Sequence, residues 1–134
     1  MAYNMSQVRK RIRDMSRKKA PRYVPPYDSK ERHIPGMNYC GPGTNVWRRL
    51  REKVQPIDEL DEAAKKHDLD VEPRGPYRSR GIPEKLRASD RRLLKVARQC
   101  AQPWHPYPHK ATALAVVLAM EYVLRTGDRG RKIK

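Results

Sequence analysis

The chain has 134 residues and is strongly basic, with 31 lysines and arginines against 15 aspartates and glutamates, for a formal net charge of +16. Hydrophobic residues make up 37% of the chain and phenylalanine is absent, so the composition supports one small core and excludes a large barrel or a two-domain enzyme. Two cysteines cannot form the framework of a disulfide-rich secreted domain; a single bridge between Cys40 and Cys100 stays open, but two free thiols are favoured. The charge favours an anionic partner, either nucleic acid or acidic lipid.

The excess charge lies mainly in the two flanks. Residues 1–36 hold ten basic and three acidic side chains, whereas residues 37–102 hold fifteen and ten, as in the mixed surface of an ordinary domain. We therefore predict a basic, proline-containing arm over 1–35 that is flexible or bound to a partner, and a folded domain over 36–102. A proline-rich linker, an apolar helix and a basic tail are predicted over 103–134.

Four helices are predicted after a glycine-rich loop at 36–43. The first follows a cap at Thr44 or Asn45 and stops before Pro56. The other three are bounded by caps, prolines and glycines, and span about 59–71, 83–101 and 109–126. The prolines and glycines at 72–82 leave room for a short β-hairpin at most. The predicted fold is mainly α.

Two of these helices carry an ionisable residue where the pattern calls for an apolar one. His67 lies in a face of small residues, and Asp90 interrupts a leucine face. If both faces point into one core, the two side chains meet there, because a buried carboxylate needs a hydrogen-bonded partner. Taken alone, the pair is compatible with a structural contact or with a solvated boundary.

Two further features lie near this pair. Asp68 follows His67 directly, and the segment 39–43 reads Tyr-Cys-Gly-Pro-Gly, in which two glycines allow a sharp turn that exposes backbone carbonyls. Calcium prefers oxygen ligands of this kind, namely loop carbonyls and a carboxylate. A glycine-rich loop, a His-Asp pair and a downstream aspartate in this order are more specific than any one of them.

In this arrangement the sequence resembles the phospholipase A2-like domain of parvoviral minor capsid proteins. The matching residues are Tyr39, Gly41 and Gly43, then Asp61, Ala63, Ala64, Lys65, His67 and Asp68. The likeness continues through Gly75-Pro76-Tyr77 and the segment 88–93, and it covers about residues 36–101. The flanks have no match of this kind.

The resemblance implies a small helical domain with a calcium loop and a calcium-dependent hydrolysis of the sn-2 ester of phospholipids. It implies that His67 is the general base and that Asp90 holds its far nitrogen. It implies calcium ligands from the carbonyls of Tyr39, Gly41 and Gly43 and the carboxylate of Asp68, with the Gly41 N–H at the oxyanion. The resemblance also implies a biological setting. It suggests a virion protein that helps to penetrate host membranes, at the endosome or on the way to the nucleus.

One position departs from the family pattern. The family commonly has His-Asp-x-x-Tyr, in which the tyrosine hydroxyl supports the downstream aspartate, but Val71 stands here and cannot hydrogen-bond. Asp90 therefore needs another partner, such as Tyr77, or the network is weakened.

Two basic regions are candidate binding surfaces. The first predicted helix offers side chains for an anionic lipid interface, or simply a solvated charged face: Trp47, Arg48, Arg49 and Arg51. The arm holds a cluster suited to nucleic-acid binding or nuclear targeting: Arg9, Lys10, Arg11, Arg13, Arg17, Lys18 and Lys19.

Two functions other than hydrolysis stay open. The chain could be a basic capsid or nucleic-acid-packaging protein whose lipase-like centre is an inactive scaffold, or a calcium-stabilised interaction module. In either case the arm and the last helix would contact nucleic acid or other capsid proteins, and the apolar segment 111–120 suits core packing or an oligomer contact. Retention of His67, Asp68 and Asp90 together favours the enzyme.

Overall fold

The computed structural model describes residues 6–7 and 21–129 of the chain. The helices whose bounds it gives are α2 (Val46–Arg51), α3 (Glu59–Val71), α4 (Pro83–Ala101) and α5 (Lys110–Thr126). These bounds confirm the four predicted helices, and the described residues contain no strand, so residues 72–82 form turns and not a hairpin. None of the helices in the described ranges has the length and hydrophobicity needed to cross a bilayer.

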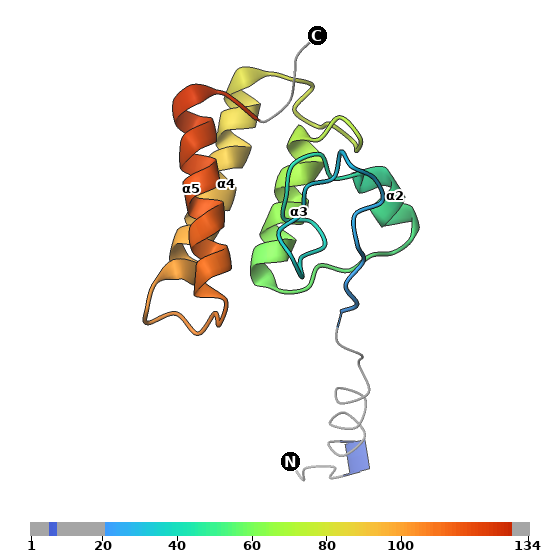
Figure 1. Ribbon diagram of the computed structural model, residues 1–134, viewed down its shortest axis with the longest axis vertical. Helices are drawn as coiled ribbons and strands as arrows, with labels where there is room; N and C mark the ends of the chain where they lie inside the picture. Colours follow the sequence, from blue (N-terminus) through green and yellow to red (C-terminus); the bar gives the residue numbers. More distant parts are fainter. Residues whose placement is uncertain (1–5, 8–20, 130–134) are drawn as a thin grey trace.

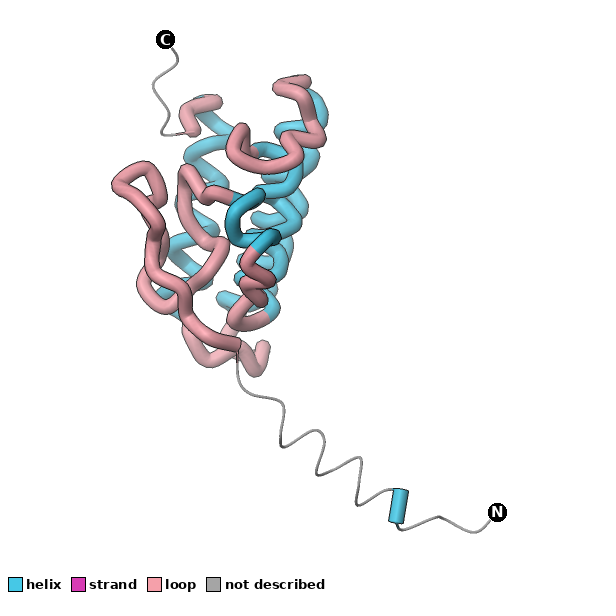
Figure 2. The backbone as a smooth tube through the Cα atoms, turned by 90° about the vertical axis from the view of Figure 1, so that its right-hand side faces the viewer, coloured by secondary structure: helices cyan, strands magenta, loops and turns pink. Residues whose placement is uncertain are grey.

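The three long helices form one antiparallel layer. α3 packs on α4, and α4 packs on α5, each running opposite to the one before it (Figure 1). The short α2 lies beyond α3, and the segment 21–45 winds over these two helices (Figure 1). This long stretch without a helix therefore lies on one side of the helices (Figure 2). The core contains aliphatic side chains from all three long helices, among them Leu60, Ala64, Leu93, Leu94, Ala97, Ala113, Val116 and Val117.

Helix α3 begins where the sequence predicts because Asp58 caps it. The Asp58 carboxylate accepts the Asp61 N–H at 2.9 Å and the Tyr107 hydroxyl at 2.8 Å. Beyond α4, the Lys110 ammonium donates to the carbonyl of Cys100 at 2.8 Å and to two further carbonyls of the same turn. The predicted linker after residue 102 is thus packed against the helical domain and leads directly into α5.

Replacing Asp58 with alanine should lower the free energy of unfolding by about 1–2 kcal/mol, the usual cost of an N-cap whose N–H groups lose their acceptor. Urea denaturation measures this loss. Tyr107→Phe keeps the cap and removes only the hydroxyl contact, so it should cost less. Equal losses in the two variants would contradict the capping role.

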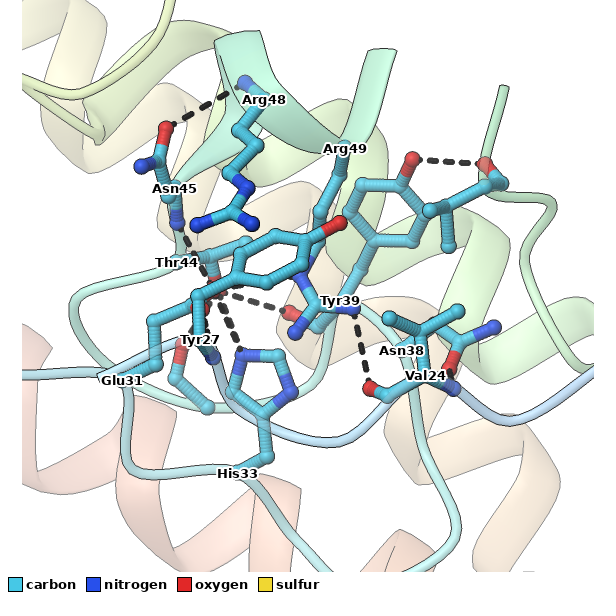
Figure 3. Close-up of polar contacts among 12 residues, drawn as sticks. Val24, Tyr27, Glu31, His33, Asn38, Tyr39, Thr44, Asn45, Arg48 and Arg49 are labelled. Atoms are coloured by element: carbon cyan, nitrogen blue, oxygen red, sulfur yellow. Dashed lines mark hydrogen bonds and ion pairs between the residues drawn. The ribbon is translucent and has the colours of Figure 1, made fainter. Parts of the chain in front are cut away.

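A buried ion pair binds the segment before the glycine-rich loop to α2. Glu31 and Arg49 meet at 3.1 Å, and neither side chain reaches solvent. Glu31 also accepts the N–H groups of Tyr27 and Asn45 at 2.8 Å each. The Arg49 guanidinium donates to the carbonyl of Val24 at 3.1 Å (Figure 3). Part of the arm predicted over 1–35 is therefore packed on the domain.

This arrangement corrects the prediction for Arg49. The basic pattern of α2 places Arg49 on a lipid-facing surface, but its guanidinium is enclosed by Glu31 and by backbone carbonyls of residues 24–25. Trp47, at 49% exposure, and the two arginines Arg48 and Arg51 do face solvent. The seven basic residues of the predicted nucleic-acid or targeting cluster lie outside the described residues.

Candidate functional site

One carboxylate holds the glycine-rich loop on α3. Asp61 is fully buried, and its two oxygens accept four backbone N–H groups at 2.7–3.0 Å, those of Asn38, Tyr39, Cys40 and Ile57. The family motif includes Asp61, but no role follows for it from the sequence. One sequence signal does indicate burial: Asp61 lies seven residues, or about two turns, before Asp68, so the two side chains share one side of the helix.

Both loop glycines are required by close packing. Gly41 and Gly43 have φ angles of 151° and 77°. A Cβ atom at Gly41 would lie 2.1 Å from the carbonyl oxygen of Arg32, and one at Gly43 would lie 2.0 Å from that of Lys30. The loop therefore lies directly against the segment 30–34, with Arg32 N–H donating to the Pro42 carbonyl at 3.0 Å.

The two interrupted helix faces meet, as their patterns predict. His67 of α3 and Asp90 of α4 are 23 residues apart in sequence, and the Nε2 of the imidazole lies 2.7 Å from the Asp90 Oδ1. Both side chains are buried. Since Asp90 accepts at Nε2, the neutral imidazole carries its proton there and leaves Nδ1 with a lone pair.

The second partner of Asp90 is Arg129 and not Tyr77. The Arg129 guanidinium donates to Oδ1 at 2.9 Å and to Oδ2 at 2.6 Å. Tyr77 instead lies in a turn with φ 47°, and its hydroxyl lies beside Gly81. Local sequence gives no signal for Arg129, because it follows α5 and is 39 residues from Asp90.

The predicted metal ligands converge in part. The Asp68 Oδ1 lies 3.6 Å from the His67 Nδ1, and the Asp68 Oδ2 is buried without a hydrogen-bond partner. The Thr44 hydroxyl lies 3.0 Å from the Gly41 carbonyl oxygen and 3.5 Å from that of Tyr39. Tyr39, Gly41 and Asp68 all line the same cavity. One hydroxyl proton cannot fully satisfy both carbonyls, and the Asp68 Oδ2 has no donor at all, so these oxygens suit a hard cation.

The fourth predicted ligand has a different partner. The carbonyl of Gly43 accepts a hydrogen bond from the Arg74 guanidinium, which also pairs with Asp28 at 2.7 Å. A carbonyl oxygen has two lone pairs, so Gly43 could keep this partner and still bind an ion. Thr44, which the sequence singles out only as a helix cap, also lies among these oxygens.

A family model described as a phospholipase A2-like domain matches residues 30–100, more than half of the chain. The chain belongs to the phospholipase A2-like domain family. The match confirms the resemblance seen in the sequence and begins beside the buried Glu31. No curated protein and no solved structure matched the chain. Helix α5 and Arg129 lie beyond the matched segment of the phospholipase A2-like domain.

Two carboxylates control the charge of the imidazole in this phospholipase A2-like site. Burial alone would lower the pKa of His67, but the neighbouring carboxylates of Asp68 and Asp90 outweigh burial and raise the pKa to about 9. Burial raises the pKa of Asp68. Burial also acts to raise the pKa of Asp90, but His67 and Arg129 outweigh it and lower that pKa. A cation beside Asp68 would oppose the imidazolium and lower the pKa of His67.

The site opens into an apolar cavity of about 580 Å³. Polar groups in its lining include His67 and Asp68, and most of the remaining lining is apolar. The glycine-rich loop and α3 contribute to it, and α5 contributes a further side with Ala115, Val116 and Ala119. A cavity lined by aliphatic side chains with a few polar groups fits a ligand that has a long apolar part and one reactive polar group.

Proposed function

We propose that this protein is a calcium-dependent phospholipase A2-like hydrolase that cleaves the sn-2 ester of phospholipids. The observation that supports this most directly is the 2.7 Å contact between Asp90 and His67, because His67 and the buried Asp68 both line an apolar cavity. The apolar lining can accommodate an acyl chain. A general base next to a cation site is the arrangement needed to hydrolyse the ester bond of that chain.

The geometry supports the following roles for the chain's own groups. Asp90 holds the Nε2–H of His67, so that Nδ1 is the nitrogen free to take a proton from water. The water oxygen then bonds to the ester carbonyl carbon, the bond to the glycerol oxygen breaks, and the imidazolium of His67 returns its proton to that oxygen, so that the products are a fatty acid and a lysophospholipid. The imidazolium formed meanwhile is stabilised by Asp90, and the Gly41 N–H is the proposed donor to the oxyanion.

The calcium ligands that we propose are the carboxylate of Asp68 and the carbonyls of Tyr39, Gly41 and Gly43. When bound, calcium supplies a Lewis acid that polarises the ester carbonyl. The unpaired Asp68 Oδ2 and the crowded acceptors around Thr44 support this assignment.

The proposal is tested with phospholipid vesicles, by measuring free fatty acid in the presence of calcium or of a chelator. Fatty acid release that requires calcium and comes from the sn-2 position is expected. Release of equal rate in the chelator, or no release in either condition, would overturn the proposal.

A titration of the His67 imidazole by NMR tests calcium binding independently of hydrolysis. In chelator the imidazole should titrate near the pKa of about 9. Calcium should move the midpoint to lower pH, because a cation next to Asp68 disfavours the imidazolium. The rate of hydrolysis should accordingly rise with pH as His67 loses its proton. Asp68→Asn should abolish the effect of calcium on this signal, and an unchanged response in that variant would exclude Asp68 as a ligand.

The setting that we propose is a virion protein that acts on a host membrane, as the family implies. The formal charge of +16 also suits a basic capsid or packaging protein that binds nucleic acid through its flanks. Measuring DNA or RNA binding across a salt series separates the membrane-acting protein from the packaging protein. A steep loss of affinity with salt is expected for phosphate contacts, and full-chain variants in which the seven basic arm residues are neutral should lose it.

A further inference from the structure

The Asp90 carboxylate is held by a bidentate ion pair from outside the family segment. Arg129 donates one N–H to Oδ1 at 2.9 Å and another to Oδ2 at 2.6 Å. His67 shares Oδ1, at 2.7 Å. The carboxylate thus has a partner on each oxygen, and the fork of the guanidinium fixes its plane. Four residues after His67, Val71 is buried and has no group that could do the same.

The turn after α5 positions Arg129. Gly127 has a φ of 73° and ends the helix with its N–H on the Val123 carbonyl at 2.8 Å. Asp128 then donates its N–H to the Thr126 hydroxyl at 3.1 Å and accepts from the Tyr122 hydroxyl at 2.9 Å. These contacts reverse the chain toward α4, where the Arg129 side chain is only 19% exposed.

We propose that Arg129 is a positioning residue for the His67–Asp90 pair. This inference rests on the proposed function. Without the guanidinium, the buried Oδ2 of Asp90 would lose its donor, and the carboxylate could rotate away from the Nε2 of His67. The positive charge of Arg129 also keeps Asp90 ionised, which the orientation of the imidazole requires. The catalytic apparatus therefore extends beyond the matched residues 30–100 to the segment that follows α5.

The test compares Arg129→Gln and Arg129→Lys in the full chain, with Arg125→Gln as the matched control. Arg125 lies in the last turn of α5 and is exposed, so its replacement removes the same charge without touching Asp90. Two readouts are used: kcat and KM on phospholipid, and the low-field proton NMR signal of the His67 Nε2–H bound to Asp90.

For Arg129→Gln we expect kcat to fall by about 10–100-fold, as for other groups that orient a functional histidine, with KM little changed. The low-field signal should broaden or disappear. Arg129→Lys should recover part of kcat and of the signal, because the ammonium keeps the charge and one donor. Arg125→Gln should leave both readouts unchanged.

Wild-type kcat and a wild-type signal in Arg129→Gln would overturn the inference. An equal loss of kcat in Arg125→Gln would also overturn it, since that result would indicate a general effect of charge on lipid binding. If the wild-type chain hydrolyses no phospholipid, the proposed function fails, but the NMR signal still decides whether Arg129 positions His67. If Arg129→Gln does not fold, Arg129→Lys carries the comparison, and a signal and kcat equal to those of wild type would then count against bidentate positioning.

Discussion

Replacing His67 with alanine is expected to lower the rate of calcium-dependent fatty acid release by about 10²–10⁴-fold, the usual contribution of a general base. The imidazole is the group that both contacts Asp90 at 2.7 Å and faces Asp68. Its removal leaves the candidate calcium ligands in place, so calcium should still bind. The measurement is the initial rate on phospholipid vesicles at saturating calcium.

Two variants make this result specific. His109→Ala removes an exposed imidazole that makes no side-chain cap contact at the start of α5, and it should keep the wild-type rate. His67→Gln preserves more of the buried volume and should lose as much activity as the alanine variant. Hydrolysis that survives in both His67 variants would rule out the proposed base.

The second large effect concerns Asp61. Exchanging it for asparagine should lower the free energy of unfolding by about 3–5 kcal/mol, because four backbone N–H groups lose a charged acceptor and one oxygen becomes a donor. The four distances of 2.7–3.0 Å show that the whole carboxylate is used. Chemical denaturation gives the stability, and hydrolysis should be lost together with the geometry of the loop.

Glu62→Gln is the control for this change. Glu62 is the next residue of α3, and its exposed side chain has only a 3.7 Å contact with Lys66. Such a surface pair contributes little, so the loss should stay below about 0.5 kcal/mol. A loss at Asp61 no larger than that at Glu62 would show that the loop is held by other contacts.

The helices are predictable because their signals are local. Asp58 caps α3, Pro83 occupies the first position of α4 and Gly127 ends α5, and each of these signals acts within one turn. The meeting of His67 and Asp90 is predictable for a related reason, since each breaks an apolar stripe and a buried charge needs a partner.

The remaining features depend on contacts between distant segments. Arg49 follows the basic pattern of an exposed helix face, but Glu31, 18 residues earlier, folds over it and forms a buried pair. Arg129 follows α5 and reaches Asp90 only because α4 and α5 are antiparallel. No periodicity in either segment indicates such a partner, so both roles become visible only in three dimensions.

The way in which the segment 22–45 is attached has a consequence for how the protein loses activity. This segment has no helix or strand of its own, and it is bound to the helices by Asp61, by the Glu31–Arg49 pair and by the buried side chains of Met37, Tyr39 and Cys40. Because, within the described residues, no regular backbone hydrogen bonding joins this segment to the helices, we expect it to detach as a unit, at a lower free energy than global unfolding. The candidate calcium ligands Tyr39, Gly41 and Gly43 would then be lost in one step. Mild heating should therefore inactivate the protein while its helical content is still intact.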